Sequence, residues 1–362
     1  MKYSFEDFLK SDQWTDLNKH YLNFNQTLES NISNNINVHQ REVIREKLKD
    51  RIKQANPEKI SLLKEELLSG NVVAVDGTCA NYDLLTVGFQ ARIGIIAVNY
   101  KNKKTEHTLY ISEPFIPYEK ENYEEIMEYA LKKKKGKTGI SSLHVTAVML
   151  YKEREIVIER PEKYKMIQGD IFPYELKTGQ GRLRGLNACL KLGRKILETE
   201  SVVATQTTSS DPAFRLIGNA LDPGEYIEIY DYYDNLTEFL LGDGESDTHS
   251  FAARFNPSDK EAFELFISDA RGKFTVGIFK GIHSNRAYVF YAPTRNLDTM
   301  VNLLFADSSF QPMRGFPLLL DYADTICSRL LSGQDFKKQV EAKLARRKIL
   351  DLELNEKTTR RR

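Results

Sequence analysis

The clearest hydrophobic signal in the chain is a short run of mostly β-branched residues, Val72–Val75, bounded by Gly70 and Gly77. Consecutive apolar residues leave no polar face, so the run predicts a strand that is buried on both sides. Asp76 follows at once, which places a carboxylate at the carboxyl edge of the predicted sheet. An ionised carboxylate there needs a compensating partner, such as a metal ion, an arginine or several backbone N–H groups.

Hydrophobic periodicity beyond this strand predicts a meander and then alternating helices and strands. Residues 84–114 are expected to form three further strands of the meander, with a turn at residues 101–104 between the second and the third, and residues 118–139 a helix that ends in a lysine run. Residues 140–164 favour a helix, although their alternation also permits a hairpin. The remaining elements are a helix at 181–200, a strand at 201–211 and antiparallel strands at 274–281 and 286–293. This alternation is typical of α/β domains.

Polarity divides the chain into three predicted parts. Residues 1–68 are polar, with helical spacing between Val38 and Ile52, and are expected to form an N-terminal helical arm that packs on the core or pairs with another copy. Residues 69–330 hold the α/β domain. Residues 331–362 are expected to form a charged C-terminal helix followed by a basic tail.

Composition narrows the classes of function. The 362 residues include 52 Lys+Arg and 51 Asp+Glu, and a net charge of +1 means that any basic binding surface must be local. Three widely spaced cysteines argue against disulfides and a cysteine zinc site, and indicate a reducing compartment. The lack of an apolar leader or a long apolar window predicts a cytoplasmic protein that does not enter membranes. The lack of a Walker A motif indicates that the chain does not itself hydrolyse ATP.

The arrangement of acidic residues indicates a two-metal nuclease of the ribonuclease H type. Such a site gathers carboxylates from several elements at one sheet edge, because two divalent ions stabilise both the attacking and the leaving oxygen of a phosphodiester. Hard oxygen ligands suit Mg²⁺ or Mn²⁺. Asp76, at the end of the buried strand, is the natural first ligand.

Three short motifs resemble the NurA nucleases. The segment VVAVDGTCA, residues 72–80, is similar to the first signature of that family, an apolar strand followed by Asp-Gly-Ser or Asp-Gly-Thr. The segment RGFPLLLDYADTIC, residues 314–327, is similar to its closing Gly-Tyr-Pro segment and the helix after it. The segment ESVVATQTTSSDPAFRLIGNAL, residues 200–221, resembles the strand after its central helix. The resemblance implies a ribonuclease H-like central mixed sheet with flanking helices.

The resemblance also assigns the first half of a metal site. Asp76 matches the first metal-binding aspartate of the family, and the helix-borne glutamate falls on Glu153, with Glu155 as the alternative. Each residue has a plainer interpretation. Asp76 followed by glycine is also a common turn pair, and Glu153 on a charged helix is also typical of a solvated residue.

The second half of the site departs from the family pattern. The Asp-Gly-Ser of the second strand is Gln168–Asp170 here, the tyrosine of the closing segment is Phe316, and the Ala-His pair has become Ala323 and Asp324. Asp170 and Asp324 are expected to replace the missing acid and histidine, because carboxylates bind the same hard cations. Alternatively Asp170 only braces a turn, and Asp324, whose main rival is Asp321, is a helix-surface acid.

Local basic residues are candidates for DNA contacts. Asp170, Glu175 and Lys177 form a D-x4-E-x-K pattern like that of restriction-type nucleases, but the gap is short and Pro173 interrupts the strand that this motif needs. Each neutralised phosphate adds salt-dependent affinity. The predicted DNA-binding residues are Lys177, Arg182, Arg184 and Lys191, with a further lysine run at Lys132–Lys137.

The sequence therefore predicts a metal-dependent DNA nuclease in which Asp76, Glu153, Asp170 and Asp324 hold one or two Mn²⁺ or Mg²⁺ ions. The resemblance implies a homodimer that works with a HerA-type hexameric ATPase on DNA, in end processing or in defence against phage. The competing hypothesis is a catalytically decayed adaptor that binds DNA or the ATPase without cutting. The positions that keep it open are Gln168, Phe316 and Asp324.

Overall fold

The computed structural model describes residues 38–84, 88–101, 104–117, 142–179, 185–207, 211–242 and 255–346. The chain forms two compact units, Met1–Asp50 and Arg51–Arg362. Helix α3 (Val38–Leu48) belongs to the first unit. The helix expected at 118–139, with its lysine run, lies outside the described residues, as do Arg182 and Arg184.

The described residues of the second unit are built on one ten-stranded mixed sheet, with the order β1-β8-β9-β10-β7-β6-β2-β3-β4 and β5 paired to β3. Strands β2, β6 and β7 are parallel, and the other pairings are antiparallel. The strands are β1 Ile52–Gln54, β2 Val72–Leu84, β3 Gly88–Lys101, β4 Lys104–Ser112, β5 Phe115–Pro117, β6 Tyr164–Gln168, β7 Val202–Gln206, β8 Glu225–Asp231, β9 Phe274–Lys280 and β10 Ala287–Pro293.

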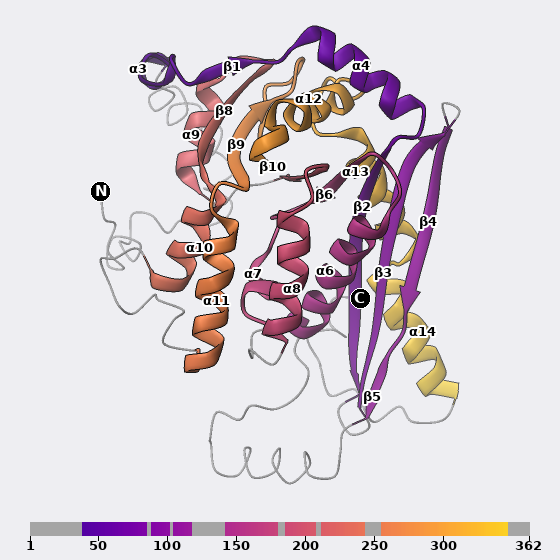
Figure 1. Cartoon of the computed structure of the whole chain (residues 1–362). Coiled ribbons are helices and arrows are strands. Elements are labelled where there is room, and N and C mark those ends of the chain that lie inside the picture. The colour runs from indigo at the N-terminus through magenta and orange to yellow at the C-terminus, as the bar shows by residue number, and fades with distance from the viewer. Residues whose placement is uncertain are drawn as a thin grey trace, which may run out of the picture. The chain divides into compact units, whose positions relative to one another are not determined.

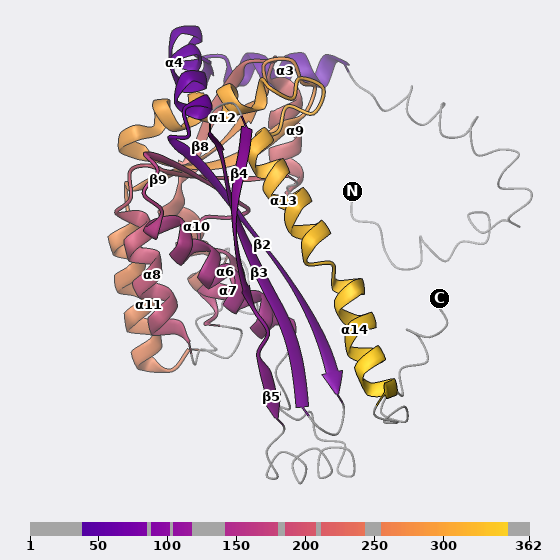
Figure 2. The same ribbon diagram turned by 90° about the vertical axis from the view of Figure 1, so that its right-hand side faces the viewer.

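Helices cover both faces of this sheet (Figure 1). One face carries α4 (Pro57–Leu68), α12 (Leu297–Ser308) and α13 (Leu318–Leu330), and a short 3-10 turn, η3 (Thr294–Asn296), precedes α12. The other carries α6 (Ser142–Glu159), α7 (Tyr174–Lys177), α8 (Leu186–Leu197), α9 (Pro212–Ala220), α10 (Tyr232–Leu241) and α11 (Pro257–Ala270). Helix α14 (Gly333–Arg346) runs beside the far half of β2 (Figure 2).

The predicted meander is confirmed in part: β2, β3 and β4 are consecutive antiparallel neighbours, but residues 88–101 form the single strand β3 where two strands are expected. Residues 140–164 contain helix α6 rather than a hairpin. The expectation that the aspartate strand ends at Asp76 is wrong, because β2 continues to Leu84. Its residues pair with β6 only over Val72–Val75, and beyond that point β3 alone satisfies the backbone. Asp76 is therefore the first residue of β2 that has left the parallel part of the sheet.

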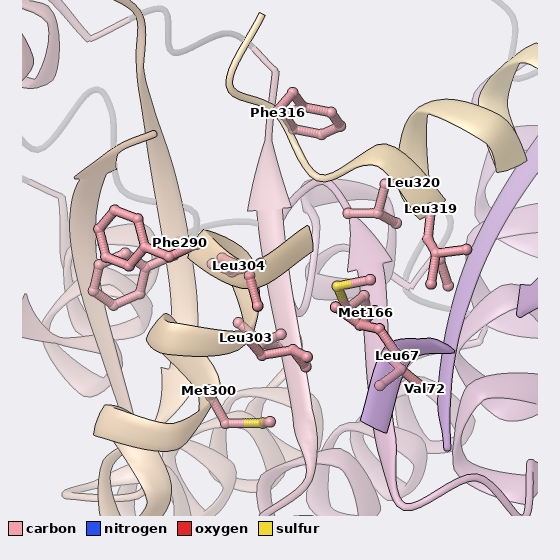
Figure 3. Packing of buried hydrophobic residues seen from close by; sticks show 14 of the residues in the cluster. Leu67, Val72, Met166, Phe290, Met300, Leu303, Leu304, Phe316, Leu319 and Leu320 are labelled. Carbon is pink, nitrogen blue, oxygen red and sulfur yellow. The ribbon is translucent and has the colours of Figure 1, made fainter. Parts of the chain in front are cut away.

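A large hydrophobic core lies under α4, α12 and α13 (Figure 3). Val72 of β2 and Met166 of β6 meet Leu67 of α4 there, and all three side chains are fully buried. Phe316, which stands where the NurA family has tyrosine, is also fully buried, with its ring 5.2 Å from that of Tyr288. Phe316 is therefore a core residue at the start of α13.

A buried carboxylate anchors α13 on this core. Helix α13 follows Pro317, which has no side-chain group to cap it, and Asp307 of α12 instead accepts a hydrogen bond from the backbone N–H of Leu319 at 2.9 Å. The Asp307 side chain is completely buried, and this burial raises its pKa to about 7. The capped helix then delivers Asp324 and Cys327 to β2.

We expect Asp307→Asn to weaken the pH dependence of folding. An unfolded aspartate titrates near 3.9, so the folded state retains a proton that the unfolded state has lost, and stability falls as pH rises from about 4 to about 7. Asparagine keeps an oxygen acceptor without the charge. The loss of unfolding free energy between pH 5 and pH 8, measured by urea titration, should shrink by about 2 kcal/mol. The exposed Asp335→Asn should leave it unchanged, and an unaltered profile in Asp307→Asn would contradict this role.

Candidate active site

Asp76 and Gln168 lie side by side at the carboxyl end of the parallel strands. Val75 pairs with Ile167 in the parallel register, so the next residues along the two strands are Asp76 and Gln168. Side chains alternate along a strand, and Met166, two residues before Gln168, belongs to the core under α12 and α13. Asp76 and Gln168 therefore face the side of the sheet that carries α13.

Glu153 approaches the same place from the opposite face, over Gly77. A Cβ atom added to Gly77 would lie 3.2 Å from Glu153 Oε2 and 2.9 Å from Met149 Cγ. Helix α6 therefore packs Met149 and Glu153 closely against the strand backbone at Gly77, where a larger residue would crowd both side chains. The turn interpretation of this pair does not apply, since β2 continues through it. Glu153 is 1% exposed, so it is not a solvated residue.

Burial and like charge hold protons on both acids. Burial raises the pKa of Asp76 to about 7, and the nearby carboxylate of Asp324 adds to the effect, while the Gly77 N–H and Arg154 oppose it. Burial raises the pKa of Glu153 to about 8, where Arg154 lowers it and Asp76 raises it. Asp76 therefore interacts electrostatically with both Glu153 and Asp324.

Arg154 is a residue of this site that the sequence interpretation missed. Its side chain is completely buried, and its guanidinium lies 3.4 Å from Glu153 Oε1. It also donates to the backbone carbonyls of Asp170 and Ile171, which ties α6 to the loop after β6. The helical spacing contained the signal, because Arg154 falls on the buried stripe that includes Ala147 and Val157.

Asp170 is engaged by hydrogen-bond and ion-pair partners of its own. The phenol of Tyr232 donates to Asp170 Oδ1 at 2.9 Å, and the backbone N–H of Phe172 donates to the same oxygen at 3.1 Å. The Lys177 ammonium lies 3.1 Å from Asp170 Oδ2 and donates to Asn235 Oδ1 at 2.8 Å. The structure thus places Asp76 within electrostatic range of both Glu153 and Asp324, and it engages Asp170 in a polar cluster with Tyr232 and Lys177.

The predicted DNA contacts have different surroundings. Lys177 is 5% exposed, so its ammonium faces the protein interior and Asp170 rather than a phosphate in solvent. Lys191 is exposed on α8. Arg182 and Arg184 lie outside the described residues.

The two alternative acids are engaged elsewhere. Glu155 forms an ion pair with Lys152 on the outer side of α6. Asp321 forms an ion pair with Arg314 and accepts a hydrogen bond from Gln311. Between Glu153 and Glu155, and between Asp324 and Asp321, the residues that interact electrostatically with Asp76 are Glu153 and Asp324.

An unpaired buried oxygen completes the donor set. Gln168 Oε1 is buried and has no hydrogen-bond partner, next to Asp76 in the strand register. A buried acceptor without a partner is costly, so this atom is suited to a ligand that the protein itself does not supply. Within the described residues, no three side chains of histidine, cysteine, aspartate or glutamate converge as a ready metal cluster. The oxygen donors around the end of the parallel strands are the carboxylates of Asp76, Glu153 and Asp324 and the amide oxygen of Gln168.

The fold is similar to that of the NurA nucleases. A scan of protein-family models gives no match, and no curated protein matches the chain. Among solved structures, the NurA nuclease from Sulfolobus solfataricus is similar over 92% of this chain and 98% of its own, with a TM-score of 0.53 and 12% identity. A second NurA structure is similar over 94% of this chain and 99% of its own, with a TM-score of 0.50 and 11% identity. This likeness confirms the predicted ribonuclease H-like class of α/β fold.

The structure also bears on the expectation that the chain does not enter membranes. No helix among the described residues is both long and apolar enough to span a bilayer.

We expect Glu153→Gln to reduce the pH dependence of folding in EDTA. An unfolded glutamate titrates near 4.3, so the folded state binds the extra proton up to about pH 8, and stability falls as pH rises through this window. Removing the titration should cut the loss of unfolding free energy between pH 6 and pH 9 by about 2 kcal/mol. Glu155→Gln is the matched control on the same helix. Equal profiles for Glu153→Gln and wild type would show that Glu153 is not the buried acid described here.

Proposed function

We propose that this chain is a metal-dependent nuclease that cleaves DNA. The observation that carries the proposal is the placement of Asp76, at the carboxyl end of the parallel strands of a NurA-like sheet, within electrostatic range of Glu153 and Asp324. Carboxylates from three different elements around one strand end are what phosphodiester hydrolysis with divalent ions requires. The strand, helix α6 and helix α13 each contribute one acid.

The donors present fit Mg²⁺ or Mn²⁺. Asp76, Glu153 and Asp324 are hard oxygen ligands, and the unpaired Oε1 of Gln168 adds a neutral one beside Asp76. The raised pKa values of Asp76 and Glu153 reflect desolvation and like-charge repulsion, which a bound cation would relieve. When bound, such an ion lowers the pKa of a coordinated water and stabilises charge on the phosphate.

The chain's own residues position this donor set. Arg154 fixes Glu153 and the loop after β6 through its ion pair and its carbonyl contacts. The Lys177 ammonium holds the Asp170 carboxylate through an ion pair. We infer that Asp170 joins the metal site when Lys177 releases it, which would complete the predicted set of four acids.

The proposed partners follow from the resemblance to NurA. They are DNA, a second copy of the chain and a HerA-type hexameric ATPase, in end processing or in defence against phage. The absence of a Walker A motif is consistent with a motor supplied by another chain. A cytoplasmic location also belongs to this proposal.

A second candidate function is an adaptor that binds DNA or the ATPase without cutting it. The specific observation in its favour is the state of the second-strand acids: Gln168 carries no charge, and Asp170 is occupied by Lys177 and Tyr232. In that case Asp76, Glu153 and Asp324 would be retained from a nuclease ancestor without supporting cleavage.

Cleavage assays separate the two functions. Wild-type protein should cut labelled linear or single-stranded DNA with Mn²⁺ or Mg²⁺, alone or with a HerA-type ATPase, and EDTA should abolish cutting. Asp76→Ala should reduce the rate by at least about a hundredfold, because it removes the central ligand. The surface variant Asp269→Asn, which loses only an ion pair with Arg194, should retain the wild-type rate. Folded protein that binds the ATPase and never cuts would favour the adaptor.

Metal-induced stabilisation tests whether Asp170 joins the site. A ligand that binds only the folded state raises the melting temperature in proportion to its binding energy. Lys177→Met frees Asp170, so we expect a larger Mn²⁺-induced increase than in wild type, and Asp170→Asn should give a smaller one. Asp76→Asn is the negative control. If both variants lose stability in EDTA but show the wild-type increase with Mn²⁺, Asp170 is only a brace.

A further inference from the structure

A cavity that is lined by none of the candidate acids opens beside helix α9. It has a volume of about 420 Å³ and lies against the start of β10 and the end of β7. The described residues that line it include no aspartate or glutamate. Its polar and aromatic lining consists mainly of Gln206, Phe214, Arg215, Asn219, Asn285 and Arg286.

The cavity stands at the same end of the sheet as the candidate active site. Gln206, at the carboxyl end of β7, pairs with Val289 near the start of β10. The strand order β10-β7-β6-β2 places β10, which carries one wall of the cavity, three strand spacings, or about 14 Å, from β2. The cavity lies on the face of the sheet that carries α6 and Glu153, opposite to the face toward which Asp76 points. A ligand that follows the carboxyl ends of the strands would pass from one site to the other.

The cavity is also linked to the polar cluster around Asp170. The Gln206 amide donates to the phenol of Tyr291 at 2.9 Å, and the Tyr291 ring packs edge-on against Tyr232 at 5.7 Å. Tyr232 in turn donates to Asp170. This chain of contacts runs along the α6 side of the sheet, where Glu153 lies.

The lining has the chemistry of a nucleotide site. Arg215 and Arg286 bring two guanidinium groups to the cavity, and guanidinium is suited to phosphate. The amides of Asn219 and Asn285 offer donors and acceptors for a base edge. Phe214, whose ring is stacked on Tyr230 at 6.1 Å and 25°, gives an aromatic surface on which a base can stack.

Close packing fixes this geometry. Helix α9 packs so tightly on β10 that a Cβ atom on Gly218 would lie 2.7 Å from the Cβ of Ala287. The backbone that carries Phe214 and Arg215 is therefore held directly against the strand that carries the other wall of the cavity.

We propose that this cavity binds an unpaired nucleotide of the DNA strand that reaches the active site. The proposal rests on the proposed nuclease function for its choice of ligand. The phosphate lies between Arg215 and Arg286, and the base lies against Phe214. The cavity then fixes the position of the strand relative to Asp76 without taking part in the chemistry.

The test is oligonucleotide binding by the full chain in EDTA, where no cleavage can occur. The probe is fluorescein-labelled single-stranded oligothymidylate, followed by anisotropy over a series of NaCl concentrations. The double variant Arg215→Gln/Arg286→Gln should weaken binding at least about tenfold and lower the salt slope by about 0.7 for each lost phosphate contact. Phe214→Leu should weaken binding of thymidylate and adenylate strands alike, because stacking tolerates any base.

Arg295→Gln is the matched control. Arg295 has an 84% exposed side chain, pairs with Glu200, and follows β10 at the opposite end of the sheet. This variant should bind like wild type. Unchanged binding by the double variant, equal loss in Arg295→Gln, or no binding by wild type would overturn the proposal. Cleavage assayed in parallel keeps the two proposals apart. If wild-type protein cuts DNA and the double variant binds the oligonucleotide normally, the nuclease proposal stands and only the pocket proposal fails.

Discussion

The short parallel pairing between β2 and β6 is the constraint on which the rest of the site depends. Only Val72–Val75 pair with β6, which ends at Gln168. The chain then turns at Gly169, whose φ of 96° lies in the region that side chains disfavour. Because β6 leaves the sheet here while β2 continues, β2 is paired only with β3 beyond Val75, and the buried Asp76 lies at this junction.

Packing on the two faces of β2 then determines which acids meet. Helix α6 lays Glu153 over Gly77, and α13, anchored by Asp307, carries Asp324 and Cys327 to the other face. The thiol of Cys327 lies 3.9 Å from the backbone oxygen of Asp76. Burying the carboxylates of Asp76 and Glu153 destabilises the folded state at high pH, and the positive charge of Arg154 offsets this loss of stability only in part. Such destabilising arrangements are common where a protein binds a ligand.

The departures from the NurA pattern fall into two physical kinds. Phe316 is a fully buried core residue against Tyr288, so its change from tyrosine concerns packing. Gln168 and Asp324 instead lie beside Asp76, one through strand register and the other through its charge. The resemblance assigns a carboxylate to the position of Gln168 and an imidazole to that of Asp324, so these two positions concern the donors around the strand end.

The sequence by itself determined the elements and the type of fold. The apolar run before Asp76, the meander and helix α6 follow from local periodicity, because burial patterns repeat with the strand or helix period. Tertiary structure decided the surroundings of each acid. Strand β2 outlasts Asp76 because β3 continues to pair with it, and Asp170 points to Lys177 and Tyr232 because α7 and α10 pack beside it. These contacts join residues distant in sequence, and no local pattern specifies which of several acids will meet.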